Sequence, residues 1–294
     1  MIGPVAFVGL GMMGQPMAAR LVDAGFDVRG SDLSAKARET FAANGGKAFA
    51  NARVAAQGAV ILITMLPDGR IVNDALLGQG GAAEVLAAGA LVVDMSSSAP
   101  MQTRGLAGDL MAKGISLIDA PVSGGVKRAL DGSLAIMAGG DAAHIERARP
   151  LLAAMGKSII ATGPIGSGHA VKALNNYVSA AGLAAACEAA LVAEKFGVDP
   201  SVLIDVLNVS TGRNNSTDLK MKPFILSGSF ASGFAMALMA KDLRTASKLA
   251  AELGVDAGGA RDAAELWAEA SQALGKDADH TEIYRFLAAR SGKA

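Results

Sequence analysis

The sequence contains few of the residues that cross-link a chain or give it a strong charge. Its 294 residues include one cysteine, Cys187, so no internal disulfide can form. Lys and Arg together number 27, as do Asp and Glu, and the formal net charge is zero. This balance argues against nucleic acid or an anionic membrane as a partner, because both attract an excess of positive charge. Because the chain has a single cysteine and no internal disulfide, we expect a reducing, cytoplasmic setting.

Other signals are absent as well. No basic segment precedes an apolar signal-like run, because the chain opens on the strand-like IGPVAFVGL. The histidines lack the spacing of metal ligands, so no metal is expected; they are His144, His169 and His280. The apolar run 178–193 resembles a membrane span, yet it is rich in alanine and carries Glu188, which favours a buried core helix. With 51% hydrophobic residues, we expect a globular protein of two domains.

Glycine is abundant instead, at 36 residues, and three glycines form a motif after the first strand-like run. Gly9, Gly11 and Gly14 have the spacing G-x-G-x-x-G. In a strand-turn-helix context the first glycine allows a tight turn, the second lets a pyrophosphate approach the backbone, and the third lets helix and strand pack closely. The motif alone is weak evidence in a glycine-rich chain. Its flanking strand and helix predict a dinucleotide site.

A second strand-like run, residues 26–32, ends in Asp32, which lies 18 residues beyond the last glycine of the motif. An acid at this point accepts hydrogen bonds from the adenosine ribose and repels a 2′-phosphate. Leu33, which follows, supplies no cation to hold such a phosphate. We therefore predict NAD rather than NADP. Three nearby cations leave NADP open, and these are Arg29, Lys36 and Arg38.

Further short apolar runs alternate with helical stretches and predict a parallel, doubly wound sheet covered on both faces. They span residues 59–64, 90–94, 115–119, 134–138 and 158–161. Ligands of such sheets bind beyond the carboxyl ends of the strands, where the chain has polar loops at 65–68, 96–100 and 120–125. Singly, each could be a strand-to-helix turn, with Ser96 to Ser98 as helix N-caps ahead of Pro100. Three such loops on one edge favour a ligand site.

After residue 163 the strand signal stops and the pattern becomes helical. Helices are expected at 167–196, 200–210, 217–227, 235–254, 256–274 and 279–290. We place the boundary at Thr162-Gly163-Pro164, with a dinucleotide-binding domain at 1–163 and an all-helical substrate and oligomerisation domain at 164–294. The predicted fold is therefore α/β, with an N-terminal Rossmann-type doubly wound parallel sheet and an all-α C-terminal domain joined by a long interdomain helix.

The long helix carries an unusual polar group near its start. Lys172, Asn175 and Asn176 are spaced i, i+3 and i+4, so they project from one side of an otherwise apolar helix. Taken alone, they could form a polar edge facing solvent. Arg213, in a polar loop between helices, and Lys241 could likewise be solvated surface charges.

Taken together, these segments resemble the β-hydroxyacid dehydrogenases, the 3-hydroxyisobutyrate dehydrogenase family, over essentially the whole chain. The matching stretches are residues 7–17, 65–68, 94–97, 119–125, 168–176 and 241–242. The resemblance implies a Rossmann domain joined by the long helix to an all-helical domain, with the active site in the cleft between them.

The resemblance also implies roles for single residues. Lys172 would be the catalytic acid/base, which protonates the carbonyl oxygen as hydride arrives from the nicotinamide, or takes the hydroxyl proton in the reverse reaction. A positioned ammonium suits this chemistry because it stabilises negative charge on oxygen and supplies the proton. The substrate-binding residues would be Ser123, Gly124, Gly125, Asn175, Asn176 and Lys241. The cofactor-binding residues would be Gly9, Gly11, Met12, Met13, Gly14, Asp32, Met65, Leu66, Pro67, Ser97 and Lys241.

The substrate is less determined than the reaction. The Ser-Thr-Gly-Arg loop at 210–213 looks more like the 3-hydroxyisobutyrate group than the tartronate semialdehyde reductases. We predict NAD-dependent oxidation of a small β-hydroxyacid to its semialdehyde, or the reverse reduction. Tartronate semialdehyde-, serine- and 4-hydroxybutyrate-type substrates stay open.

Two other readings use the same scaffold. Imine reductases usually carry another residue in place of Lys172 and favour NADP, and a non-catalytic dinucleotide-binding scaffold would have lost this lysine. Lys172 argues against both, and Asp32 argues further against the first. The alanine-rich helices present more apolar surface than one chain can cover, so a homodimer or homotetramer is expected.

Overall fold

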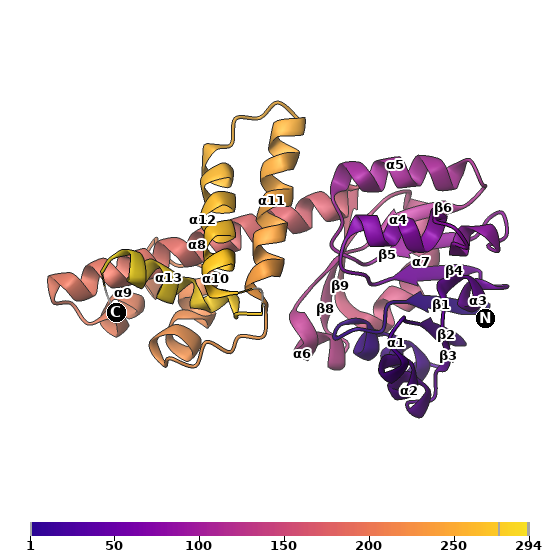
Figure 1. The fold of residues 1–294 in the computed structure, drawn as a ribbon, viewed down its shortest axis with the longest axis horizontal. Coiled ribbons are helices and arrows are strands. Elements are labelled where there is room, and N and C mark those ends of the chain that lie inside the picture. Colours follow the sequence, from indigo (N-terminus) through magenta and orange to yellow (C-terminus); the bar gives the residue numbers. More distant parts are fainter. Residues whose placement is uncertain (1, 276, 293–294) are drawn as a thin grey trace. The chain divides into compact units, whose positions relative to one another are not determined.

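The computed structural model describes residues 2–275 and 277–292. The chain divides into two compact units, Met1–Lys172 and Ala173–Ala294, which we call the first and second units (Figure 1). The boundary expected at residue 163 between a cofactor domain and a substrate domain stays a prediction.

The first unit alternates strands and helices. Its strands are β1 (Val5–Val8), β2 (Val28–Ser31), β3 (Lys47–Phe49), β4 (Ile61–Thr64), β5 (Leu91–Asp94), β6 (Ser116–Asp119), β7 (Val122–Ser123), β8 (Leu134–Gly139) and β9 (Gly156–Gly163). Its helices are α1 (Gly14–Asp23), α2 (Ala35–Ala43), α3 (Ala52–Ala56), α4 (Gly69–Leu77), α5 (Pro100–Met111), α6 (Gly125–Leu130) and α7 (Ala142–Met155), with a short 3-10 turn η1 (Ala82–Glu84).

The sheet is covered on both faces, as the apolar runs predict. Successive residues of β1 point to opposite cores: Val5 and Phe7 pack with α1, α6 and α7, while Ala6 and Val8 pack with α3, α4 and α5. The strand order begins β3-β2-β1-β4-β5-β6, and these six strands are parallel. This order is that of the dinucleotide-binding doubly wound fold, and it confirms the predicted Rossmann-type architecture.

The far edge of the sheet departs from the expectation of a parallel sheet throughout. β8 runs antiparallel to β6 and β7, and β9 is parallel to β8. A parallel crossover needs a long return segment, usually a helix. Between β6 and β8 the chain has the two-residue strand β7 and one helix, α6, which is six residues or about 9 Å long and so shorter than β8 itself at about 20 Å. The chain therefore enters β8 from the opposite end.

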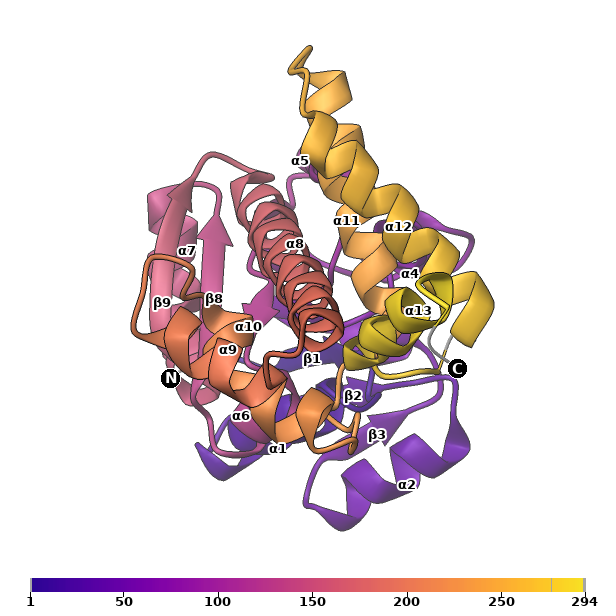
Figure 2. The same ribbon diagram turned by 90° about the vertical axis from the view of Figure 1, so that its left-hand side faces the viewer.

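The second unit is all-helical among its described residues, as expected. The long helix α8 (Ser167–Phe196) begins in the first unit and continues into the second, where α9 (Pro200–Asn208), α10 (Asn215–Leu219), α11 (Met236–Glu252), α12 (Gly258–Leu274) and α13 (Ile283–Arg290) follow. Figure 2 shows α11 and α12 side by side. Trp267 of α12 is fully buried, in one core with Cys187 of α8 and Met239 of α11.

One expected helix is interrupted. Residues 217–227 contain the end of α10 and a separate π-helical turn, η2 (Met221–Leu226), rather than one continuous helix. Pro223 lies inside this turn and has no N–H to donate, so a regular α-helical hydrogen-bond ladder cannot run through it. A second short turn, η3 (His280–Glu282), leads into α13.

The apolar helix α8 is partly buried, as a core helix is. By length and composition it could cross a membrane, and 44% of its apolar window is buried within the protein, a property that core helices share. Cys187 is fully buried, and burial raises the pKa of its thiol far above the usual range. Cys187 therefore behaves as a small buried hydrophobe.

Candidate cofactor site and catalytic helix

The three glycines of the motif have different physical roles. Gly9 has φ +102° and a Cβ there would lie 2.3 Å from the Met65 carbonyl oxygen, while a Cβ on Gly14 would lie 1.9 Å from the Gly9 carbonyl oxygen. Both positions are closed to a side chain by the fold itself. A Cβ on Gly11 would meet no atom within 4 Å. The fold therefore leaves the backbone at Gly11 open, and a ligand can approach it closely there.

The helix that follows is open at its start. Among the described residues no side chain caps α1, whose N-cap is Met13. In contrast, Ser34, Asp68 and Asp141 accept hydrogen bonds from the first turns of α2, α4 and α7. A helix start of this kind suits a phosphate, because its N–H groups and the helix dipole both favour an anion.

Asp32 joins the glycine loop to the turn after β2. Its Oδ2 accepts from the Leu10 amide at 2.7 Å and its Oδ1 accepts from the Ser34 amide at 2.8 Å. A carboxylate has about four acceptor sites, so two remain for ribose hydroxyls. The Arg38 guanidinium donates to the carbonyl oxygens of Asp32 and Leu33 at 2.8 and 3.0 Å, which places a cation at the same strand end.

The loops after β4 and β5 are tied to each other. Leu66 N donates to Ser96 Oγ at 2.9 Å. The buried carboxylate of Asp94, at the end of β5, accepts from Thr64 Oγ1 and Ser98 Oγ, both at 2.8 Å, and from Ser96 N at 3.0 Å. Hydrogen bonds therefore join the two loops that carry the predicted cofactor residues Met65, Leu66, Pro67 and Ser97. Asp94 is the residue that holds them, and its site role was not foreseen.

The reading of Ser96 to Ser98 as helix N-caps is wrong. The N-cap of α5 is Ala99, and Pro100 occupies the first helical position. Ser96 to Ser98 therefore precede the N-cap residue, whose alanine side chain offers no acceptor to the amides of the first turn. The Ser96 hydroxyl instead accepts from Leu66 N in the loop after β4, and the Ser98 hydroxyl donates to Asp94 at the end of β5.

The predicted substrate turn is built on left-handed backbone. Gly124 and Gly125 have φ of +132° and +66°, and a Cβ on Gly124 would lie 2.4 Å from the side chain of Arg128. Ser123 ends β7, directly before them. Only glycine adopts two such conformations in succession without strain, so the turn can present its amides to an anion at close range.

In the second unit, α8 and α11 share a buried polar contact. Asn176 Nδ2 donates to Asp242 Oδ2 at 2.6 Å, and both side chains are buried. Asn175 Nδ2 donates to Asn176 Oδ1 at 3.1 Å, and Lys241 Nζ lies 3.4 Å from Asp242 Oδ1. Asp242 thus joins Asn176 to Lys241, with Asn175 bonded to Asn176. Asp242 was not among the predicted site residues.

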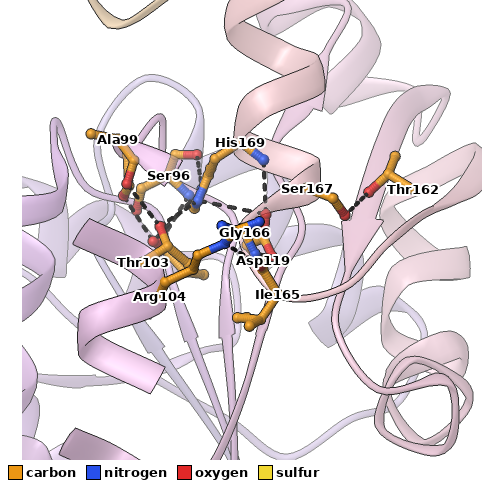
Figure 3. A network of polar contacts seen from close by, with 12 residues as sticks. Ser96, Ala99, Thr103, Arg104, Asp119, Thr162, Ile165, Gly166, Ser167 and His169 are labelled. Atoms are coloured by element: carbon orange, nitrogen blue, oxygen red, sulfur yellow. Dashed lines mark hydrogen bonds and ion pairs between the residues drawn. The ribbon is translucent and has the colours of Figure 1, made fainter. Parts of the chain in front are cut away.

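Lys172 is the last residue of the first unit, on α8, one helical turn before Asn176. The helix start is fixed in that unit by Asp119 at the end of β6, whose carboxylate accepts from Gly166 N at 2.7 Å and from His169 N at 2.8 Å (Figure 3). Asp119 is a second residue that pattern reasoning missed, because it reads as the end of a strand. In residues 2–275 and 277–292, no three His, Cys, Asp or Glu side chains gather as metal ligands would.

The chain is similar to known proteins over most of its length. Residues 4–163 match a family described as the NAD binding domain of 6-phosphogluconate dehydrogenase, and residues 166–287 match the NAD-binding region of NADP-dependent 3-hydroxyisobutyrate dehydrogenase. The chain is 40% identical to 2-(hydroxymethyl)glutarate dehydrogenase of Eubacterium barkeri over 239 residues, 81% of this chain and 79% of that protein. It is 39% identical to 3-sulfolactaldehyde reductase of Escherichia coli over 251 residues, 85% of this chain and 84% of that one.

A solved structure is similar over nearly the whole chain. The 3-hydroxyisobutyrate dehydrogenase of Mycobacterium tuberculosis, solved with L-serine, superposes with a TM-score of 0.91 at 36% identity, covering 98% of this chain and 99% of that one. Fold and site thus define an NAD(P)-dependent dehydrogenase that acts on CH–OH donors. The chain belongs to the β-hydroxyacid dehydrogenase family, of the 3-hydroxyisobutyrate dehydrogenase type.

Two alanine substitutions in the glycine loop should separate stability from cofactor binding. Gly14→Ala should lower the free energy of unfolding by about 1–3 kcal/mol, because its methyl group overlaps the Gly9 carbonyl. Gly11→Ala should leave stability within about 0.5 kcal/mol but raise the Kd for NADH about tenfold or more, because its methyl group occupies space that only the cofactor needs. Denaturant unfolding and NADH fluorescence titration measure the two effects. Equal loss of stability in both variants would contradict this division.

Proposed function

We propose that this enzyme oxidises a small β-hydroxyacid of the 3-hydroxyisobutyrate type to its semialdehyde with NAD, or catalyses the reverse reduction. The observation that carries the proposal is the place of Lys172. It follows a helix start anchored by Asp119 at the carboxyl end of β6, in the same unit as the glycine loop at the carboxyl end of β1. Ligands of this fold bind at that edge.

Each group at the site then has one task. The nicotinamide ring, when bound, accepts or returns the hydride. Lys172 takes the hydroxyl proton during oxidation and returns it during reduction, and general acid–base catalysis of this kind contributes about 10²- to 10⁴-fold. The amides of the turn at Ser123, Gly124 and Gly125 hold the substrate carboxylate. Asn176 and its neighbour Asn175 orient the substrate oxygen and Lys172, and Lys241 closes over cofactor and substrate.

The substrate is proposed from the relatives and from the loop at 210–213. The relatives are named for 2-(hydroxymethyl)glutarate, 3-sulfolactaldehyde and 3-hydroxyisobutyrate, so the family accommodates several acids. The loop at 210–213 favours the last of these, and its Arg213 pairs with Asp218 at 2.8 Å. Tartronate semialdehyde-, serine- and 4-hydroxybutyrate-type substrates are the alternatives. An imine reductase or a non-catalytic scaffold is disfavoured by Lys172.

The first prediction of this proposal concerns turnover. Turnover of 3-hydroxyisobutyrate, L-serine, glycerate and 4-hydroxybutyrate with NAD is measured from the absorbance of the NADH formed. The first of these acids should give the highest kcat/KM. Lys172→Ala should lower kcat on that substrate by about 10²- to 10⁴-fold, because the proton acceptor is lost, and should leave the Kd for NADH unchanged. No turnover of any acid would refute the proposed activity. Full turnover by the alanine variant would refute only the role of Lys172.

A second prediction concerns NAD against NADP. Asp32→Ser removes the carboxylate that repels a 2′-phosphate and leaves Arg38 at the same strand end. The ratio of kcat/KM for NAD to that for NADP should fall about tenfold or more, equivalent to about 1.4 kcal/mol. The double variant Asp32→Ser/Arg38→Ala should lose the gain with NADP. A ratio unchanged by Asp32→Ser would show that another group sets the preference.

A third prediction concerns assembly and location. Several large apolar side chains of α8 and of the α9 segment are exposed in the single chain, among them Phe196 at 84% and Val209 at 86%. We infer that a second copy covers them in a homodimer or homotetramer. Sedimentation velocity should show such a species at micromolar concentration; a monomer throughout would rule it out. The cytoplasmic location stays a prediction.

A further inference from the structure

A buried polar cluster lies beneath the carboxyl edge of the sheet and has no part in the chemistry proposed above. Its members are Asp94, Thr103, Asp119 and His169, each at most 2% exposed. Figure 3 shows three of them, Thr103, Asp119 and His169. Burying ionisable groups costs free energy unless they are paired and hydrogen-bonded. All four lie in the first unit, and their partners connect α8 to the loop that carries Ser97.

The first turn of α8 is seated directly on the sheet. In addition to the two hydrogen bonds to Asp119, the backbone approaches so closely that a Cβ on Gly168 would lie 2.2 Å from the Met137 carbonyl oxygen. A Cβ on Gly139 of β8 would lie 2.6 Å from Asp119 Oδ1. The start of the helix therefore has one position against β6 and β8. Because a helix is stiff over a few residues, this position also limits where Lys172 lies.

The imidazole of His169 connects the start of α8 to a neighbouring helix and to a loop. Nδ1 lies 2.8 Å from Thr103 Oγ1 of α5, and Nε2 lies 3.2 Å from the Ser96 carbonyl oxygen. A carbonyl can only accept, so Nε2 carries a proton and donates it. The carboxylates of Asp94 and Asp119 flank the ring, each with Oδ2 3.7 Å from a ring nitrogen. One side chain thus bonds to both a neighbouring helix and the loop after β5.

That loop is itself part of the expected cofactor site. Ser96 precedes Ser97, and its hydroxyl accepts from Leu66 N in the loop after β4. A continuous set of hydrogen bonds therefore runs from Leu66 through Ser96 to His169, three residues before Lys172. We propose that His169 is a positioning residue, which holds Lys172 in a fixed relation to the cofactor loops after β4 and β5. The proposal rests on the roles given above to Lys172 and Ser97.

The test compares His169 with a neighbour on the same turn. His169→Leu keeps the volume and removes both ring contacts; kcat should fall about 10- to 100-fold, since a displacement near 1 Å of a catalytic group can cost that much. The Kd for NADH should rise several-fold as the Ser96 loop loosens. His169→Gln, whose amide can donate to Ser96 O and accept from Thr103, should restore most of both. Ser167→Ala is the control, because Ser167 bonds to Thr162 at 2.7 Å and not to the cofactor loops; it should change neither constant more than about twofold.

Two further variants keep the test decisive. In a Lys172→Ala background, His169→Leu should lower kcat no further and should still raise the Kd for NADH. Thr103→Val removes the Nδ1 contact together with the bond of the Thr103 hydroxyl to the Ala99 carbonyl, and leaves the contact of His169 with the Ser96 carbonyl. Its effects should be smaller than those of His169→Leu and of the same kind, which covers the case of a leucine variant that does not fold. A lowered Tm with wild-type kcat and Kd would overturn the proposal. If the wild type turns over no acid, the proposed function fails, whereas the NADH titration still judges the link to the loop.

Discussion

The carboxylate of Asp119 is the point on which the arrangement of this enzyme depends. It is fully buried at the end of β6 and accepts the Gly166 and His169 amides at the start of α8. A negative charge at a helix N-terminus is favoured by the helix dipole as well as by the hydrogen bonds. Without these two amides the charge would be buried unpaired, at a cost of several kcal/mol. These two hydrogen bonds therefore stabilise the start of α8 at this position.

Lys172 lies between two buried polar anchors along that helix. On the N-terminal side are the contacts of Asp119 and His169 in the first unit, and on the C-terminal side is the bond between Asn176 and Asp242 in the second. Each anchor is made within its own unit. A long, flexible lysine side chain gains a defined origin from such an arrangement, because the backbone on both sides of it is held.

The cofactor loop shows how one motif divides between folding and function. Gly9 and Gly14 are glycines because backbone atoms of the protein lie where a Cβ would be, whereas Gly11 faces open space. Asp32 combines both demands, since its carboxylate holds the Leu10 amide and keeps acceptor sites for a ribose. If Asp32 selects NAD as we propose, cofactor choice and the rigidity of the glycine loop are linked through one side chain.

Local patterns in the sequence were sufficient for much of this protein. The alternation of apolar runs and helices predicted the Rossmann-type sheet and the helical second half, and the glycine spacing and Asp32 predicted the dinucleotide site, because these features depend on residues close in the chain. Tertiary structure decided the rest. The antiparallel β8, the bond between Leu66 and Ser96 across the sheet edge, and the anchoring roles of Asp94, Asp119, His169 and Asp242 all arise between segments that are distant in the chain. A buried carboxylate at a strand end and a histidine in a helix have no local pattern that reveals their partners, since which strand ends meet is a property of the folded sheet.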